Sequence, residues 1–387
     1  MSEPSVGAAK GVILYVHVET LPSPMAGSGF AANTCLGLAE AGNPALFLTG
    51  RGDAPDDAAA LAAYGLVPHP LLDVRRVAFL AGLRFPIYAA VLREALRLGG
   101  EGRLRAIVSR SAKALAFLSR LRRRLAGVPL VFEMHGRPPE AIEGMEKRRR
   151  AIRRRKKEGK LLEWVDGVVL VTEAQRSMLP ERFQRGARVL VAPAGHRGGA
   201  WGAGADRVPG RVVYLGQLDE HKGIDVLVDA APRLPEAMSL EVIGGPDRVE
   251  ELRRRTERAR GGARVALTGA LPQGEALARL RSAEVAVAPY LDVPYNHYLT
   301  PTKVYEYMAA GAAIVASDVP CERGLLRHGE NALLVPPGRP GELAAAIARL
   351  HAEPALRERL AARAREDVRE RTWTARGKAI AAFADAL

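Results

Sequence analysis

Residues 298–317 read YLTPTKVYEYMAAGAAIVAS, and this stretch predicts a loop, a helix and a buried strand in succession. Thr300 is expected to cap the helix and Pro301 to occupy its first position, because these residue types are favoured there. The small residues that follow let the helix pack closely against the next apolar run, which is the strand. A loop, a helix and a strand in this order are typical of an α/β protein.

The start of this helix is also a candidate ligand site. The backbone N–H groups of Thr302 and Lys303 are expected to be free there, and such a helix N-terminus suits a diphosphate. Glu306 lies one turn further along on the same side, where it can accept hydrogen bonds from a ribose diol. The alternative is an ordinary helix start followed by a solvated glutamate.

On either side of this stretch the chain alternates short apolar runs with helical stretches, the pattern of a doubly wound parallel sheet. At 387 residues it exceeds what one core usually supports, so two domains are expected. The predicted strands are 12–17, 45–49, 106–109, 130–133, 167–172, 189–192, 212–216, 240–244, 265–268, 285–289, 313–316 and 332–335. The predicted helices are 30–41, 140–164, 224–234, 249–260, 274–283, 302–310, 341–350 and 373–387.

The predicted fold is therefore α/β, with two doubly wound Rossmann-like domains that face each other across a cleft. Residues 1–200 are expected to form the first domain and residues 201–370 the second, with a linker rich in Gly and Pro at 195–210. A last helix occupies 371–387, and its docking site does not follow from the sequence.

The net charge of +14 is concentrated in the first half of the chain. Residues 1–200 hold 31 Lys or Arg against 18 Asp or Glu, whereas residues 201–387 hold 26 against 25. In the segment from Lys147 to Lys160, 10 of the 14 residues are basic. This asymmetry favours an anionic partner for the first half, such as an acidic membrane surface, a phosphorylated lipid carrier or nucleic acid. The alternative is a merely solvated basic helix.

Two cysteines without metal-ligand spacing predict neither a disulfide framework nor a zinc site, and they favour a reducing, cytoplasmic compartment. The first apolar run, residues 11–18, is too short to span a bilayer and lacks a cleavage site, so no signal peptide is expected.

Three further turns carry candidate ligand groups. In YLGQLDEHKGIDV, residues 214–226, Lys222 places a cation beside the same diphosphate, where it can help the leaving group depart. The turn IGGPD at 243–247 brings the backbone close to a ligand at Gly244. In the first half, Gly27 and Gly29 permit a tight turn between strand and helix, and His135 follows a strand at its carboxyl end.

The turns GQL....KG and IGGP, the segment TPTKVYEYMAAGAAIVASD and the strand end ExH together resemble family four of the glycosyltransferases, which are retaining enzymes with the GT-B fold. The resemblance covers essentially the full chain, and it implies that residues 1–200 form the acceptor-side domain and residues 201–370 the nucleotide-sugar domain. It implies that Glu306 binds the ribose, that Lys222 binds the diphosphate, and that His135 lies close to the reacting sugar. It also implies retention of anomeric configuration without a divalent metal or other cofactor.

Two positions depart from the family pattern. Tyr298 stands where many members have a glutamate that contacts the sugar, and Gln217 stands where many have an arginine. The expected catalytic residues are His135 and Lys222. The expected donor-binding residues are Gly27, Gly29, Gln217, Gly244, Tyr298, Thr300, Thr302, Lys303 and Glu306.

The sequence thus predicts a hexosyltransferase that uses a UDP- or GDP-linked sugar and a hydroxyl acceptor, such as a lipid-linked or cell-envelope glycan. Its expected location is the cytoplasm, at the inner face of the membrane. A nucleotide-sugar 2-epimerase of the same architecture is the first alternative. A basic nucleic-acid-binding protein is the second, but the basic run lacks interleaved aromatic residues, so nucleic acid is not an expected partner.

Overall fold

The computed structural model describes residues 11–23, 25–80, 84–125, 127–135, 149, 152, 159–160, 162–184, 186, 188–197, 207–245, 248–258 and 262–387. The chain divides into two compact units, and each is described by itself. Unit 1 comprises Met1–Pro193 together with Trp373–Leu387, and unit 2 comprises Ala194–Thr372.

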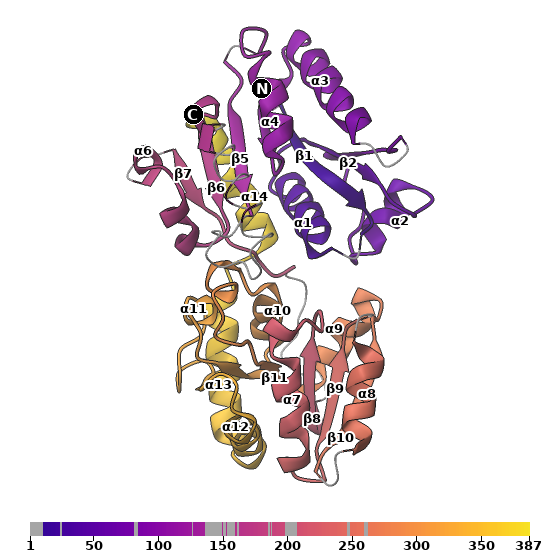
Figure 1. The fold of residues 1–387 in the computed structure, drawn as a ribbon, viewed down its shortest axis with the longest axis vertical. Helices are drawn as coiled ribbons and strands as arrows, with labels where there is room; N and C mark the ends of the chain where they lie inside the picture. Colours follow the sequence, from indigo (N-terminus) through magenta and orange to yellow (C-terminus); the bar gives the residue numbers. More distant parts are fainter. Residues whose placement is uncertain are drawn as a thin grey trace, which may run out of the picture. The chain divides into compact units, whose positions relative to one another are not determined.

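Unit 1 is built on a parallel seven-stranded sheet with the strand order β3-β2-β1-β4-β5-β6-β7 (Figure 1). The strands are β1 Val12–Leu21, β2 Ala45–Arg51, β3 Leu72–Val77, β4 Leu104–Ser109, β5 Leu130–Met134, β6 Gly167–Leu170 and β7 Val189–Val191. Six of these were predicted. The edge strand β3 was not predicted, because its sequence LDVRRV carries charges and lacks the apolar run of a strand covered on both faces.

Helices and short 3₁₀ segments cover both faces of this sheet. They are α1 Ala26–Glu40, α2 Asp57–Ala62, α3 Phe85–Gly100, α4 Ala112–Ser119, η2 Leu162–Trp164, η3 Glu173–Met178, α6 Glu181–Gln184 and α14 Trp373–Asp385. Successive residues of β1 point to opposite faces. Ile13 and Tyr15 pack in the core under α1, α2 and α14, whereas Leu14 and Val16 pack in the core under α3 and α4.

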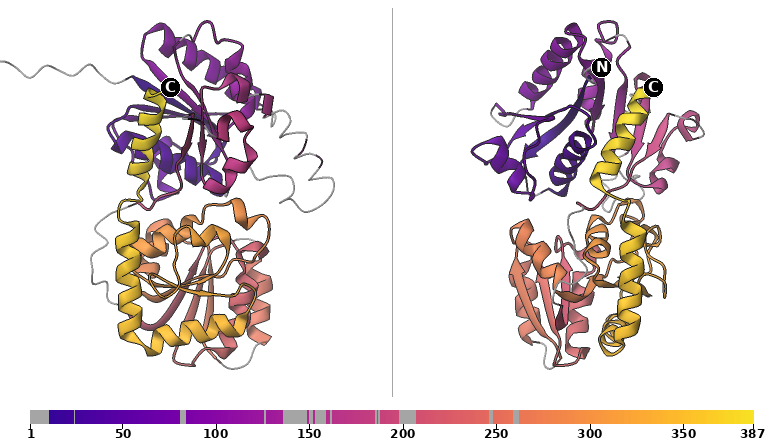
Figure 2. Two further views of the ribbon diagram at one scale, coloured as in Figure 1. Left: turned by 90° about the vertical axis from the view of Figure 1, so that its left-hand side faces the viewer. Right: turned by 180° about the vertical axis from the view of Figure 1, so that it is seen from behind.

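The last helix of the chain belongs to unit 1. Helix α14, yellow in Figure 2, runs beside α1, and its Ile380 and Ala381 are buried in the core under that face of the sheet. The structure therefore supplies the docking site that the sequence left open. The helix buries small and aliphatic residues, which allows a close approach of the two helix backbones.

Unit 2 is built on a parallel six-stranded sheet with the order β10-β9-β8-β11-β12-β13. The strands are β8 Val208–Leu215, β9 Ser239–Ile243, β10 Arg264–Gly269, β11 Ala283–Ala288, β12 Ala313–Ser317 and β13 Leu333–Val335. All six were predicted, with small differences at their ends. The two sheets confirm the α/β class with two doubly wound, Rossmann-like domains.

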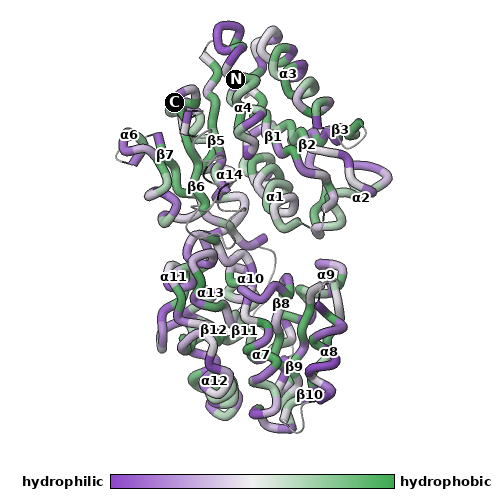
Figure 3. The backbone as a smooth tube through the Cα atoms, in the orientation of Figure 1, coloured by the Kyte–Doolittle hydropathy of each residue, from purple (hydrophilic) through white to green (hydrophobic). Residues whose placement is uncertain are grey.

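Helices also cover both faces of the second sheet. They are η4 Glu220–Lys222, α7 Ile224–Ala230, η5 Ala231–Arg233, α8 Val249–Arg258, α9 Gln273–Arg281, η6 Asn296–Tyr298, α10 Thr302–Ala310, α11 Pro320–Arg323, α12 Pro340–Ala352 and α13 Pro354–Val368. Helix α10 has the predicted bounds. Helix α13 was not predicted, since its sequence is rich in arginine and shows little apolar periodicity. In Figure 3 the strands β1 and β2 are hydrophobic and α8 is largely hydrophilic, as expected for buried strands and a surface helix.

Two sequence predictions about helix starts were wrong. Helix α1 begins at Ala26, so Gly27 and Gly29 lie inside it and do not form the turn before it. Strand β1 ends at Leu21, upstream of both glycines. The two glycines weaken the helix signal, which placed the predicted start of the helix too late. Helix α10 has Pro301 at its N-cap, and no side chain caps it, so Thr300 does not have the capping role.

No helix in the described part of the chain is both long and apolar enough to cross a bilayer.

Candidate functional site

In unit 2 the candidate groups gather at the carboxyl ends of the central strands. The strand order runs outward in opposite directions from β8 and β11, so these two neighbours form the topological switch point, where ligands bind in such sheets. The loop after β8 carries Gln217 and Lys222, and the loop after β11 leads through Tyr298 to α10. The folding of the sheet thus brings together two turns that lie far apart in the sequence.

At this edge the side chains of Lys303 and Lys222 lie against tyrosine rings. The ammonium nitrogen of Lys303 lies 3.9 Å from the ring centre of Tyr214 and 4.8 Å from that of Tyr290. The ammonium nitrogen of Lys222 lies 4.9 Å from the ring centre of Tyr290 and 3.5 Å from its hydroxyl oxygen. Cation–π contacts of this kind stabilise the charge only in part.

Both ammonium groups are buried, and burial is the main reason that their pKa values are lowered. The pKa of Lys222 falls mainly because of desolvation, and that of Lys303 falls much further, with Lys222 as the second cause. The Lys303 nitrogen has no hydrogen-bond partner among the described residues. A buried cation without such a partner is costly, and a bound anion would remove the cost.

Glu322, on α11, is the buried carboxyl group of this cluster. It is fully buried, and neither of its oxygens completes a hydrogen bond of normal geometry within the described residues. Burial raises its pKa well above the usual range, although Lys303 and Lys222 lower it. Glu322 was not predicted as a site residue, because α11 is a single turn whose only local signal is Pro320 at its start.

Glu306 lies one turn after Lys303 on α10, which places both side chains on one side of the helix. Burial raises the pKa of Glu306 to about 7, while Arg197 lowers it through its charge and through a hydrogen bond from its backbone N–H. The second oxygen, Oε2, is shielded from solvent and has no partner among the described residues, and neither has the hydroxyl of Thr300. These atoms are available to a polar ligand.

The N-terminal turn of α10 also differs from the prediction in its backbone N–H groups. The N–H of Thr302 is not free, because it donates to the carbonyl of Thr300 at 2.9 Å, and the Thr302 side chain is exposed. The favourable dipole at the helix start remains, since it belongs to the helix as a whole.

Glycines shape the loops that carry these groups. Gly223, directly after Lys222, has a φ of 73°, and a Cβ there would lie 1.7 Å from the carbonyl oxygen of Pro289. Gly244 has a φ of 157°, and a Cβ there would lie 1.8 Å from the carbonyl oxygen of Gly216. Both loops thus approach neighbouring backbone at distances that only glycine permits.

The two residues that depart from the family pattern are also placed. Gln217 is exposed, and its carbonyl accepts a hydrogen bond from the hydroxyl of Tyr214 at 2.6 Å. Tyr298 is half-buried in η6, just before α10. The roles assigned to both stay predictions.

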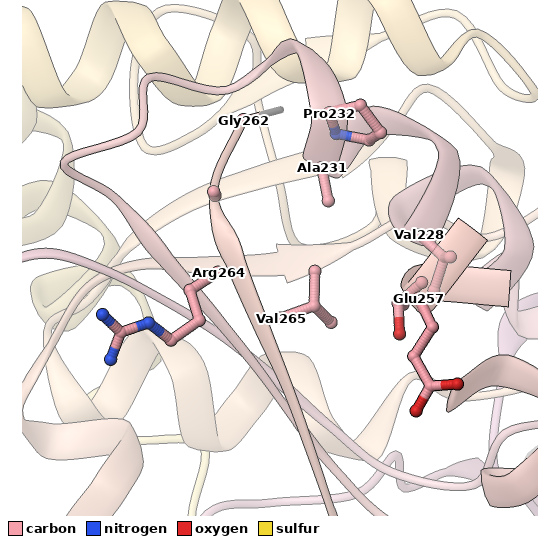
Figure 4. A pocket seen from close by; sticks show the side chains of 9 residues that line it. Val228, Ala231, Pro232, Glu257, Gly262, Arg264 and Val265 are labelled. Carbon is pink, nitrogen blue, oxygen red and sulfur yellow. The ribbon is translucent and has the colours of Figure 1, made fainter. Parts of the chain in front are cut away.

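A hollow of about 380 Å³ lies elsewhere in unit 2 (Figure 4). Its lining includes Val228 of α7, Glu257 of α8 and Arg264, the first residue of β10. It therefore lies toward the amino ends of the strands, opposite the edge with the two lysines. We do not assign it a ligand.

In unit 1 the candidate residue His135 follows β5 directly. Its ring nitrogen Nε2 contacts Oε1 of Glu133, the last residue but one of the strand, and Glu133 is fully buried. Burial and the charge of Arg110 lower the pKa of His135 to about 4, against the opposing effect of Glu133. His135 is therefore neutral at physiological pH.

Arg110 and His17 complete this end of the sheet. Arg110 follows β4, the neighbour of β5, and its guanidinium contacts the carbonyl of Gly27 and lies 5.4 Å from the ring centre of Phe30. His17 of β1 lies 3.1 Å from the hydroxyl of Ser28. Burial and Arg110 lower the pKa of His17 well below its usual range. Sequence reasoning missed Arg110 and His17 because neither stands in a recognisable motif.

Gly27 and Gly29 lie in the first turn of α1, near these groups. A Cβ on Gly29 would lie 2.9 Å from the ring of Tyr64, so this position is tightly packed. The expected contact of the two glycines with phosphate stays a prediction. Most of the basic segment from Lys147 to Lys160 lies outside the described residues.

Two family models match the chain. The model described as "Glycosyl transferase 4-like domain" matches residues 29–195, and the one described as "Glycosyl transferases group 1" matches residues 209–353. The first match lies within unit 1 but for its last two residues, and the second lies in unit 2. Between them they span most of the chain, and the chain therefore belongs to the glycosyltransferases of GT-B type that these two domains define.

Among curated proteins, a phosphatidyl-myo-inositol mannosyltransferase from Mycobacterium leprae is 35% identical over 178 residues, which are 44% of this chain and 45% of that protein. A D-inositol 3-phosphate glycosyltransferase from Thermomonospora curvata is 30% identical over 176 residues, which are 42% of this chain and 40% of that protein. The chain thus spans less than half of the length of the curated relatives it matches.

Solved structures share the fold over nearly the whole chain. Anabaena HepE in complex with UDP and glucose has a TM-score of 0.72 and 18% identity, and covers 97% of this chain and 100% of that chain. Sucrose-phosphate synthase from Thermosynechococcus elongatus has a TM-score of 0.69 and 22% identity, and covers 95% of this chain and 96% of that chain.

Proposed function

We propose that this protein transfers a sugar from a nucleoside diphosphate to a hydroxyl acceptor, with retention of anomeric configuration. The proposal depends above all on one observation. Helix α10 carries both the buried ammonium of Lys303 and the carboxylate oxygen Oε2 of Glu306, and neither group has a hydrogen-bond partner among the described residues. An anion beside the first and a diol beside the second would satisfy both groups. A ribose linked to a diphosphate carries these two features.

The two lysines are assigned the diphosphate. Its negative charge would stabilise the charged forms of Lys303 and Lys222, whose pKa values burial lowers in the unliganded protein. As the bond to the sugar breaks, charge grows on the departing phosphate, and a preorganised ammonium stabilises it. Lys222 has the role of leaving-group cation, and no divalent metal is needed for that charge.

The ribose is assigned to Glu306. Its Oε2, which has no partner among the described residues, offers an acceptor to a hydroxyl of the ribose diol. Ionised Glu306 is the stronger acceptor, so the ligand would lower its raised pKa. The solved relative HepE holds UDP, which supports a uridine nucleotide as the first donor to test.

Unit 1 is assigned the acceptor side, with neutral His135 near the reacting sugar. The relatives named above act on phosphatidyl-myo-inositol or D-inositol 3-phosphate, and the basic segment Lys147 to Lys160 suits an anionic surface. We therefore propose a lipid-linked or phosphorylated acceptor at the inner face of the membrane. Sedimentation with vesicles of anionic and of neutral phospholipid, at low and high salt, tests this part. Failure to bind anionic vesicles at low salt would eliminate it.

A thermal-shift panel of UDP, GDP, ADP and dTDP tests the donor site, because a ligand that binds only the folded state raises the melting temperature. One nucleotide is expected to stabilise the wild type and to lose its effect in Glu306→Ala. Glu358→Ala removes an exposed glutamate of α13 and serves as the control, with an unchanged shift. An equal shift in Glu306→Ala would contradict the ribose assignment.

The reaction itself is tested with the sugar of that nucleotide. A transferase needs an acceptor and is expected to be insensitive to EDTA, and NMR of the product reports whether the anomeric configuration is retained. Release of the nucleotide with an altered free sugar, in the absence of any acceptor, would instead identify the 2-epimerase.

A further inference from the structure

Helix α14 carries an arginine into the core of unit 1. Arg376 is only 4% exposed, although arginine is almost never buried without partners. Its Nε lies 3.2 Å from the hydroxyl oxygen of Thr34 in α1, and its Nη1 lies 3.2 Å from the carbonyl oxygen of Pro193. The helix thus places one cation between α1 and the end of the sheet.

The charge partner of Arg376 is Glu133. Nη2 of Arg376 lies 2.9 Å from Oε2 of Glu133, and both side chains are almost fully shielded from solvent. The other oxygen of the same carboxylate, Oε1, contacts Nε2 of His135. One carboxylate therefore links an arginine of the last helix to the candidate sugar-site histidine.

A phenylalanine holds the cluster together. Two guanidinium groups approach the ring of Phe30, that of Arg376 at 4.7 Å and that of Arg110 at 5.4 Å from the ring centre. The rings of His135 and Trp373 meet Phe30 edge to face, each with a centre distance of 4.9 Å. The imidazole of His135 is thus held by two contacts, one with the ring of Phe30 and one with the carboxylate of Glu133.

The ionic state of Glu133 decides how the imidazole is protonated. Burial by itself raises the pKa of Glu133, but Arg376 and His135 together lower it well below the usual range. An ionised carboxylate only accepts hydrogen bonds, so Nε2 of His135 must carry the proton. Since His135 is neutral, its other nitrogen, Nδ1, is a hydrogen-bond acceptor. The titratable and charged groups that face Glu133 are Tyr15, His17, Cys35, Arg110, His135 and Arg376.

We propose that Arg376 is a positioning residue for His135: through Glu133 it keeps the imidazole as the neutral Nε2–H tautomer, with Nδ1 ready to accept a hydrogen bond from a sugar or acceptor hydroxyl. The inference rests on the proposed function only where it places a hydroxyl at Nδ1. The tautomer itself is a property of the unliganded protein. The last helix of the chain is in this way part of the candidate site of unit 1.

The first test measures the tautomer without any substrate. The ¹⁵N chemical shifts of the imidazole nitrogens, assigned among the eight histidines with His135→Gln, distinguish the two neutral tautomers and the charged form. In the wild type we expect Nε2–H alone and a titration near 4. In Arg376→Met the loss of a nearby cation should raise the pKa of His135 and mix the tautomers.

The control removes another attachment of the same helix. Arg105 holds Asp385 near the end of α14 with Nε at 2.6 Å from Oδ1, so Asp385→Asn loosens the helix without touching Glu133. Its His135 signals are expected to be unchanged. Arg376→Lys keeps the charge but gives up the fork that also reaches Thr34 and Pro193, so it should retain the tautomer in part.

The second test is kinetic. If the transfer reaction is established, Arg376→Met should lower kcat/KM by about tenfold to a hundredfold, in line with the cost of misplacing a reacting group, and Asp385→Asn by less than about twofold. A folded Arg376→Met protein with unchanged His135 signals overturns the inference. If that variant does not fold, Arg376→Gln decides, because it also removes the charge, and unchanged His135 signals there would overturn the inference as well. A lack of transferase activity with the expected NMR result contradicts only the proposed function.

Discussion

Gly37 of α1 and Gly377 of α14 lie back to back where the two helices cross. A Cβ on Gly37 would lie 2.1 Å from the carbonyl oxygen of Trp373, and a Cβ on Gly377 would lie 2.3 Å from the carbonyl carbon of Gly37. The obstacle is backbone in both cases, so no side-chain rotation can relieve it. This contact lets α14 approach closely enough for Arg376 to reach Glu133.

Gly377→Ala should therefore loosen α14. We expect unit 1 to lose about 1–3 kcal/mol of stability, the usual cost of overpacking, and the amides of α14 to exchange faster with solvent deuterium. Denaturant unfolding followed by hydrogen exchange measures both. Gly100→Ala in α3, where a Cβ would meet nothing within 4 Å, is the control and should be neutral or slightly stabilising. Equal effects of the two substitutions would contradict the close contact.

Glu306→Gln should change how stability depends on pH. Burial raises the pKa of Glu306 from 4.5 to about 7, so the folded state favours the protonated carboxyl. The contribution of the protonated carboxyl to the free energy of unfolding is fully present below pH 4.5. It is lost as the pH rises to about 7, which lowers the free energy of unfolding by about 2–3 kcal/mol. The glutamine variant lacks this loss. The difference in free energy of unfolding between variant and wild type should therefore grow between these pH values. A constant difference would contradict a raised pKa of Glu306.

Lys303→Met should stabilise the protein and weaken nucleotide binding. The buried ammonium lacks a hydrogen-bond partner among the described residues, so its removal should raise the free energy of unfolding by on the order of 1 kcal/mol at neutral pH. Because the pKa of Lys303 is lowered, this advantage should shrink as the pH is raised toward 10.5, where lysine is neutral in both states. The thermal shift caused by the bound nucleotide should fall at the same time.

Lys378→Met, which replaces an exposed lysine of α14, is the control for that experiment and should change neither quantity. A Lys303→Met protein that is destabilised at neutral pH and binds the nucleotide normally would show that the ammonium has a structural role instead.

Gly223→Ala should displace Lys222. The glycine has a positive φ, and an added Cβ would collide with the carbonyl oxygen of Pro289, so the loop after β8 must move. We expect weaker nucleotide binding, measured by calorimetry, and a loss of stability of about 1–3 kcal/mol. Gly274→Ala in α9, where the space is open, should leave nucleotide affinity unchanged. Unaltered affinity in Gly223→Ala would remove Lys222 from the proposed diphosphate site.

The sequence indicated the central strands of unit 2 well because β8, β11 and β12 are largely apolar runs that both faces of the sheet bury. It also indicated the bounds of α10, where a proline precedes the helix and Gly311 ends it with a φ of 66°. Strand β3 and helix α13 were not predicted. Both are only partly buried, and their charged residues interrupt the apolar pattern that would have indicated them.

For the candidate site, sequence motifs singled out Lys222, Lys303 and Glu306, and the fold places all three at one edge of a sheet. The same motifs said nothing of Glu322, Arg110 or Arg376. Local residue order encodes helix starts and tight turns, because these depend on neighbours in the chain. It carries no comparable signal for a charge that finds its partner on a distant element.

The sequence by itself determined the class of fold, the alternation of strands and helices, and the helix start at 300–306 to which we assign the proposed nucleotide-sugar site. The tertiary structure alone decided that α14 returns to unit 1, and that its Arg376 pairs with the carboxylate of Glu133 beside His135. The physical reason is that an apolar helix face can pack against any apolar partner. Gly37 and Gly377 permit backbone contact only where α1 and α14 cross, and this contact selects one docking site for α14.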